Sequence, residues 1–177
     1  MGDDELLSNR VTAVIKTLSD VRRDFPDDRV VVFSNFVEFL DLVAEAFLRS
    51  TKTLAFHFDG TVKEGDRQTI RAAWSNSKSP HPPILVTAGA GGAEMNLQAG
   101  NHVVRRERWW TESEEMQADA RCHRKNQAKQ VRLRTMDGKT SRIDDDIKQA
   151  RDRKAAANAV NVQGKRLLRS ARLNCLL

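Results

Sequence analysis

The chain has few cysteines, no tyrosine and no long hydrophobic run. Its 177 residues include two cysteines, Cys122 and Cys175, and four prolines. Two cysteines are too few for a disulfide framework, and their spacing to the four histidines fits no compact zinc site. No apolar run approaches membrane-spanning length, and the acidic first residues include no signal-peptide stretch. We therefore expect a reducing location, nuclear or cytosolic.

The charge balance is basic but modest. Lysine and arginine number 30 against 24 acidic residues, which gives a net charge of +6. A basic balance favours polyanionic partners such as DNA or RNA. An ordinary solvated surface explains the same surplus, so charge alone does not choose between the two. The length is that of about one domain, and a hydrophobic content of 40% is enough for one packed core.

Apolar runs alternate with helical patterns along most of the chain. After an amphipathic helix that ends before Pro26, the patterns predict strands at 30–33, 54–57, 84–86, 102–105 and 131–135, and helices at 36–48, 66–74 and 112–123. Such alternation predicts a parallel sheet within a three-layer α/β domain. Ligands of such sheets gather at the carboxyl ends of the strands, so we expect a functional rim after Phe33, His57 and Val86.

Two segments have residue types suited to phosphate chemistry. Residues 87–97 form a glycine-rich segment after an apolar run, and glycine lets a phosphate approach backbone N–H groups. Further along, Arg121 and Arg124 are three residues apart, a spacing that on a helix projects both guanidinium groups from one face. Such a pair can stabilise charge on a transferring phosphoryl group. In isolation, a tight turn and a solvated helix face explain these two patterns as well.

In this order and at this spacing, the two segments, with Trp109-Trp110 between them, resemble motifs V and VI of the Swi/Snf-type ATPases, the DNA-translocating members of helicase superfamily two. Residues 30–36 resemble motif IV, and residues 58–61 with Arg67 resemble the family's Asp-Gly-Ser/Thr block and its downstream arginine. The resemblance covers roughly residues 28–155. It implies the C-terminal lobe, a RecA-like (P-loop NTPase-type) α/β fold with a mostly parallel sheet.

The resemblance also implies a domain order and a set of site residues. The predicted domains are an N-terminal amphipathic helix (1–27), the lobe (28–140), a brace-like helix (141–160) and a basic tail (161–177). The catalytic residues would be Arg121 and Arg124, reaching ATP across the cleft. The ATP-binding or interlobe residues would be Gln117, Gln127, Asn96, Gly91 and Gly92. The DNA-binding residues would be Ser34, Arg67, Thr87, Ala88, Gly89 and Trp110, whereas Trp109 is expected in the core.

The chain lacks the other half of such an active site. Neither a Walker A sequence nor a strand-terminal Asp-Glu box occurs, because the only Asp-Glu, Asp4-Glu5, follows no apolar strand. The resemblance therefore implies that ATP with Mg is shared with an N-terminal lobe, present in cis or in trans, and that double-stranded DNA in chromatin is the partner. We do not expect the chain to hydrolyse ATP alone.

Some residues depart from the family pattern. Glu94 replaces a glycine of motif V, Arg108 the proline before the tryptophans, and Asn126 a glycine of motif VI. A carboxylate beside a phosphate groove repels the ligand unless it points away. These replacements leave an alternative open, a catalytically decayed module for DNA binding or regulation. The retained arginines favour the motor lobe.

Overall fold

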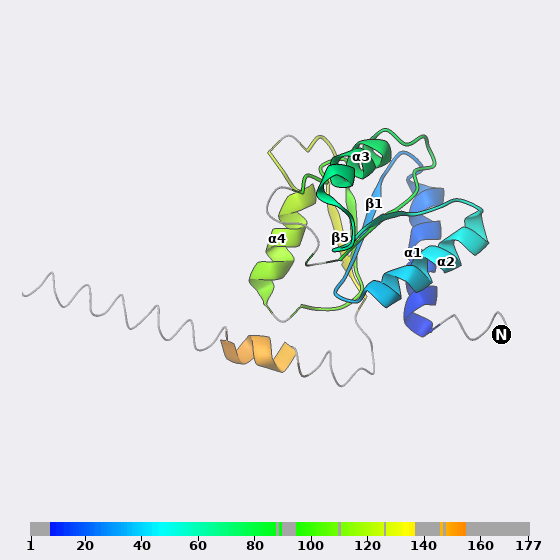
Figure 1. Ribbon diagram of the computed structural model, residues 1–177. Coiled ribbons are helices and arrows are strands. Elements are labelled where there is room, and N and C mark those ends of the chain that lie inside the picture. The colour runs from blue at the N-terminus through cyan, green and yellow to red at the C-terminus, as the bar shows by residue number, and fades with distance from the viewer. Residues whose placement is uncertain are drawn as a thin grey trace, which may run out of the picture.

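Helices and strands alternate along the chain as the sequence predicts (Figure 1). The computed structural model describes residues 8–87, 89, 95–109, 111–125, 127–136, 146 and 148–154. Their elements are α1 (Asn9–Asp24), β1 (Val30–Ser34), α2 (Val37–Thr51), β2 (Phe56–Phe58), α3 (Glu64–Ser75), β3 (Ile84–Thr87), β4 (His102–Arg105), α4 (Glu112–Cys122) and β5 (Arg132–Thr135).

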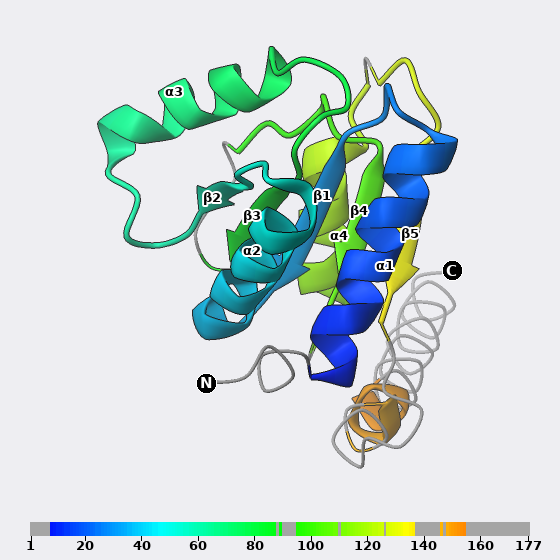
Figure 2. The same ribbon diagram turned by 90° about the vertical axis from the view of Figure 1, so that its right-hand side faces the viewer.

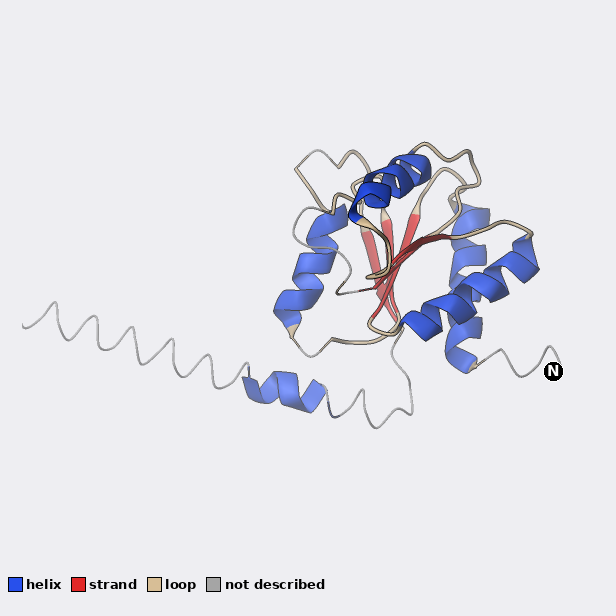
Figure 3. Cartoon of the chain, viewed as in Figure 1, coloured by secondary structure: helices blue, strands red, loops and turns tan. Residues whose placement is uncertain are grey.

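The strands form one parallel sheet with β1 in the middle. Its order is β2-β3-β1-β4-β5, and each neighbouring pair is parallel. Figure 3 shows the strands side by side, with helices on both faces. The predicted three-layer α/β fold is confirmed.

Alternate residues of β1 point into two different cores. Val30 and Val32 pack with α1 and α2 on one face, whereas Val31 and Phe33 pack with α3 and α4 on the other. Figure 2 shows α1 and α2 together on their face of the sheet. A parallel sheet covered on both faces needs apolar side chains on both, which is why β1 reads as a continuous apolar run.

The first helix covers the sheet through a stripe of valines and leucine. The Ser8 hydroxyl caps its amino end by accepting a hydrogen bond from Val11 N at 3.4 Å. Its buried apolar residues recur every three or four positions, namely Val11, Val14, Leu18 and Val21. The amphipathic helix expected near the start of the chain is therefore present, while the predicted boundary between it and the lobe stays a prediction.

Part of the C-terminal region is described. Residues 148–154 are helical, and they fall within the predicted brace-like helix. The rest of that helix, apart from residue 146, and the predicted basic tail, residues 161–177, lie outside the described residues. None of the helices in the described ranges is long and apolar enough to cross a membrane.

Candidate functional site at two edges of the sheet

Among the described residues, the predicted DNA-binding residues and the predicted arginine fingers lie at two opposite edges of the sheet. Ser34 and Thr87 are the last residues of the neighbouring strands β1 and β3, where they are register partners. They therefore share the carboxyl edge. Arg121 lies on the last turn of α4 and Arg124 just after it, where the chain has returned toward the amino end of β5. Leu97 N, ahead of β4, donates a 3.0 Å hydrogen bond to Arg121 O. The structure thus separates Ser34 and Thr87 from the predicted arginine fingers.

At the carboxyl edge, the Ser34 hydroxyl is turned inward. Ser34 is fully buried, and its Oγ lies 3.3 Å from Glu107 Oε2 and accepts a 3.1 Å hydrogen bond from Phe36 N. The backbone N–H of Asn35 donates to Glu107 Oε1 at 2.6 Å. Asn35 and Phe36 are the exposed residues of this turn. The Ser34 side chain therefore organises the turn, and its neighbours face the solvent.

Glu107 is not among the site residues predicted from the sequence. It follows β4 by two residues, is buried, and lies 3.4 Å from Arg106 Nη1. The Arg106 guanidinium lies 4.8 Å from the ring centroids of both Phe36 and Phe39, a cation–π geometry. One signal was available, because a lone carboxylate stands in the arginine-rich run directly after a buried strand.

Arg67 lies at the carboxyl end of β2, in the first turn of α3. Its Nε donates to Val62 O at 3.1 Å, its Nη1 lies 3.4 Å from Glu64 Oε2, and its guanidinium lies 5.7 Å from the Phe58 ring. The side chain is half-buried. Arg67 is therefore near the same edge as Ser34 and Thr87, with its guanidinium partly engaged inside the lobe.

The glycine-rich segment is described only in part. Thr87 is buried, and Gly89 is exposed. A Cβ added to Gly89 would meet nothing within 4 Å, so packing does not require glycine there. The predicted residues Ala88, Gly91, Gly92 and Trp110, and the replacements Glu94 and Asn126, lie outside the described residues.

At the amino edge, α4 ends before Arg124. Thr111 caps the start of α4 by accepting a 3.3 Å hydrogen bond from Glu114 N, and the helix ends at Cys122. The carbonyl of Cys122 then accepts from Arg124 N at 3.2 Å, which takes the chain out of the helix. The expectation that Arg121 and Arg124 project from one face of a single helix is therefore wrong, since a turn separates them.

The two arginines differ in environment. Arg121 is half-buried on the last turn of α4, and this burial lowers the pKa of its guanidinium from the usual arginine value. Arg124 is exposed on the turn after the helix. A planar guanidinium held at the surface can donate two parallel hydrogen bonds to a phosphate group. Arg124 is therefore the more accessible of the two for an anionic ligand.

The remaining predicted residues are placed near α4. Gln117 is exposed on that helix, with its Nε2 3.5 Å from Ser113 Oγ. Asn96 is half-buried, and its Oδ1 accepts from Gln98 N at 3.0 Å, which forms a local turn. Gln127 follows the turn that bears Arg124. Asn96 and Gln127 both lie close to the chain that enters β4.

A buried carboxylate, Glu115, joins α4 to its surroundings. Its oxygens accept from Trp109 N at 2.9 Å and from the Arg151 guanidinium at 3.0 and 3.2 Å, and Arg105 Nη1 lies 3.4 Å away. Glu115 is not among the site residues predicted from the sequence. The available signal was its helix position, because Glu115 shares a face with the buried Ala118.

Trp109 belongs to the core, as expected. It is 4% exposed, and its ring meets that of Phe33 edge-on with centroids 6.1 Å apart. Nearby, Asp119 lies 3.3 Å from Arg105 Nη1, while its burial raises the pKa of the carboxyl group. Buried charge under α4 is thus partly compensated by Arg105.

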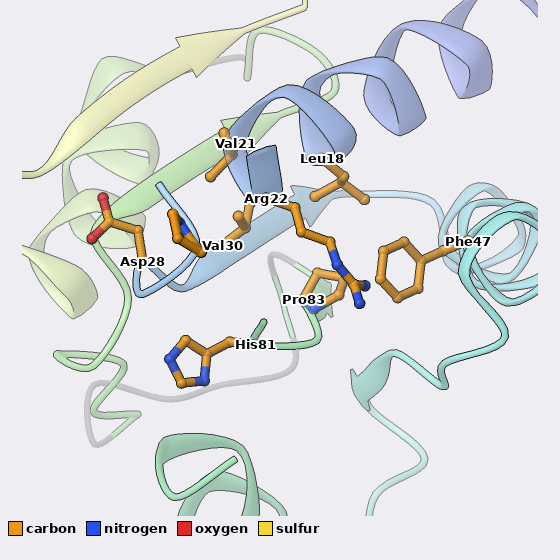
Figure 4. Close-up of a pocket in the computed structure, with 9 residues that line it drawn as sticks. Leu18, Val21, Arg22, Asp28, Val30, Phe47, His81 and Pro83 are labelled. Atoms are coloured by element: carbon orange, nitrogen blue, oxygen red, sulfur yellow. The ribbon is translucent and has the colours of Figure 1, made fainter. Parts of the chain in front are cut away.

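A small pocket lies between α1, α2 and the chain before β3 (Figure 4). Arg22 and Phe47 line it, with Asp28 and His81 on its other side. Its free volume of about 10 Å³ is room for about one water molecule and far below that of a nucleotide site. None of the predicted site residues lines it. Among the described residues, no group of three or more His, Cys, Asp or Glu side chains could hold a metal ion.

Comparison with known proteins identifies the family. The family described as helicase conserved C-terminal domain matches residues 10–126. The DNA repair protein RAD5 of Cryptococcus neoformans is 33% identical over 128 residues, which are 72% of this chain and 11% of that protein. The DNA repair protein rad8 of Schizosaccharomyces pombe is 33% identical over 126 residues, 71% of this chain and 11% of that protein. The chain thus spans about a tenth of the length of these relatives.

The fold comparison agrees. The crystal structure of the C-terminal part of the Fun30 ATPase domain matches with a TM-score of 0.76 and 28% sequence identity, over 85% of this chain and 48% of that chain. The match includes the parallel sheet and its helices. The chain therefore belongs to the helicase conserved C-terminal domain family, and it is a RecA-like C-terminal lobe of the Swi/Snf type.

Proposed function

We propose that this chain is the C-terminal motor lobe of an ATP-dependent DNA translocase, in which Arg121 and Arg124 act as arginine fingers. The observation that carries the proposal is Arg124, an exposed guanidinium on a turn directly after α4 in a lobe of this family. Its charge is available to a phosphate presented by another lobe. Several relatives are named DNA repair proteins, which supports a nuclear role in repair or chromatin remodelling.

The two edges of the sheet have different proposed roles, DNA binding at one edge and contact with the nucleotide at the other. Ser34, Arg67 and Thr87 cluster at the carboxyl ends of neighbouring strands, which supports a DNA strand at that edge. The hydroxyl of Ser34 is engaged by Glu107, so contacts there would use backbone N–H groups and the exposed neighbours. Arg121 and Arg124 serve the nucleotide at the other edge.

The residues between the two edges would couple DNA to nucleotide. Residues 95–100 lead from the glycine-rich segment to β4, and Leu97 N is hydrogen-bonded to Arg121 O. A shift of the glycine-rich segment on DNA would therefore move the end of α4. This coupling is mechanical, since it passes through hydrogen bonds and packed side chains.

ATP with Mg would supply the phosphoryl group and be bound mainly by an N-terminal lobe, in cis or in trans. Arg124 fits this role because a guanidinium stays charged and its fork of donors matches phosphate oxygens. Arg121, half-buried behind it, would add charge to the same region. Loss of an arginine finger lowers the rate on the order of a thousandfold.

The test is DNA-stimulated ATP hydrolysis by the chain, alone and mixed with the N-terminal lobe of a related motor. We expect activity only in the mixture, and its loss with Arg124→Ala. Arg134→Ala, which removes an exposed arginine of β5, is the matched control and should leave the rate unchanged. If the mixture does not hydrolyse ATP although both lobes are folded and associated, the result would instead support the alternative, a non-catalytic module for DNA binding or regulation.

A further inference from the structure

The side-chain amide of Gln127 connects two separate segments of the lobe. Its Nε2 lies 2.7 Å from Gln98 O, 3.0 Å from Gly100 O and 3.2 Å from Cys122 O. Its Oε1 accepts a 3.1 Å hydrogen bond from Lys129 N. An amide group has two N–H donors, so the three carbonyls share them. Both polar atoms of the Gln127 side chain are thus used inside the lobe.

One of these segments is fixed against the core. Gly100 N donates to Leu97 O at 2.8 Å, and Leu97 is fully buried. A Cβ on Gly100 would lie 2.6 Å from Val31 Cγ2 and 3.1 Å from the Trp74 ring. The backbone at Gly100 therefore lies directly on packed side chains, and such interiors deform little. Gln127 is anchored to a rigid part of the fold.

The other segment is the turn that presents Arg124. The amide of Gln127 binds Cys122 O at the start of this turn, and its backbone N donates to Arg124 O at 2.9 Å. Arg124 N in turn donates to Cys122 O at 3.2 Å. A single residue therefore closes the turn from both sides. The side chain of Arg124 itself is exposed.

We propose that Gln127 is a positioning residue that holds the turn of Arg124 in one geometry. Gln127 contacts no ligand in this role, because its amide faces the carbonyls of its own lobe. Fixing the backbone under an exposed arginine lowers the entropy lost when its guanidinium meets a phosphate. The catalytic part of this inference rests on the proposed function, whereas the structural part does not.

Hydrogen exchange on the chain alone tests the structural part. Gln127→Met keeps the length of the side chain and removes its donors and acceptor. We expect the backbone amides of residues 124 and 127 to exchange about tenfold faster, because the turn loses the side-chain hydrogen bonds that close it. Gln130→Met, at an exposed position nearby, is the matched control and should leave both amides unchanged. Unchanged exchange in Gln127→Met would overturn the inference.

Kinetics with a paired N-terminal lobe test the catalytic part. We expect Gln127→Met to lower kcat about tenfold with little change in the KM for ATP, because a small misplacement of a catalytic group is costly. The effect should vanish in an Arg124→Ala background, where it is measured on the residual rate that this variant retains. An equal loss in that background would overturn a role through Arg124. If the wild-type chain paired with an N-terminal lobe does not hydrolyse ATP, both the proposed function and the catalytic part of this inference are overturned. The hydrogen-exchange result still decides the structural part.

Discussion

The backbone N–H of Asn35 donates a 2.6 Å hydrogen bond to the carboxylate of Glu107, although 72 residues separate them in sequence. This contact crosses from the end of β1 to the end of β4, the strand beside it. It fixes the turn in which Asn35 and Phe36 face the solvent. The carboxyl edge of the lobe therefore depends on a buried charge.

Glu107→Ala should lower the free energy of unfolding by about 1–3 kcal/mol, because it leaves buried donors without an acceptor. Glu107→Gln retains an acceptor of the same size and should cost less. Urea denaturation measures both. Glu45→Ala removes an exposed carboxylate that pairs with Arg49 on the surface, and it should cost below about 1 kcal/mol. Equal losses for Glu107→Ala and Glu45→Ala would contradict the prediction.

Arg151→Ala should release residues 148–154 from α4, because the Arg151 guanidinium makes two hydrogen bonds to Glu115. Charge-assisted hydrogen bonds contribute about 1.5–3 kcal/mol, so the amides of residues 148–154 should exchange about ten- to a hundredfold faster. Hydrogen exchange read by mass spectrometry makes the comparison. Arg153→Ala, at an exposed neighbouring position, should change little. Equal protection in the two variants would show that Glu115 does not hold this segment.

Gly100→Ala should destabilise the fold by about 1–3 kcal/mol, because the added methyl would overpack against Val31 and Trp74. Gly65→Ala is the contrasting substitution, since nothing lies within 4 Å of its Cβ position and Gly65 is in α3. It should stabilise the fold by about 0.5–1 kcal/mol. Thermal unfolding of the two variants should therefore shift in opposite directions. Shifts of the same sign would refute the packing argument.

The buried thiol of Cys122 should make stability fall at alkaline pH. Burial raises its pKa from 9.0 to about 12. The folded state thus holds the thiol proton more tightly than the unfolded state does. The contribution of the thiol to the free energy of unfolding is therefore fully present below pH 9.0 and is lost as the pH rises toward 12. The expected loss is about 1.4 kcal/mol per pH unit above that point.

Denaturation at about pH 8 and about pH 10 measures this loss. Cys122→Ala removes the thiol, so its unfolding free energy should fall less over the same range. The chain contains no tyrosine, and its lysines are common to both proteins. Wild type and Cys122→Ala would contradict the prediction if they lost the same stability between the two pH values. The thiol would then ionise as readily in the folded state as in the unfolded state.

Affinity for DNA should fall steeply as salt rises, because the proposed contacts at the carboxyl edge are to phosphates. Two phosphate contacts predict about a tenfold loss between about 50 mM and about 200 mM salt. Fluorescence anisotropy with a short duplex measures the slope. Arg67→Ala should reduce both affinity and slope, whereas Arg153→Ala should change neither. An affinity that stays constant across this range would count against a DNA surface on this lobe.

Local sequence patterns predict much of the fold. The apolar run of β1 and the helical stripe of α1 specify their elements because period and burial are properties of neighbouring residues. Strand–helix alternation then predicts a parallel sheet. The ordered motifs predict the family, and the family match confirms it. The roles of the individual site residues stay predictions.

The sequence by itself determined the elements, the fold class and the family, because each is encoded in short-range pattern. Only the tertiary structure decided that Ser34 faces Glu107, that Glu115 binds Arg151, and that the amide of Gln127 reaches Gln98. These partners lie 73, 36 and 29 residues apart, respectively. These contacts depend on the strand order and on where α4 ends. Long-range contacts of this kind produce no periodic pattern in the sequence, so they could not be predicted from it.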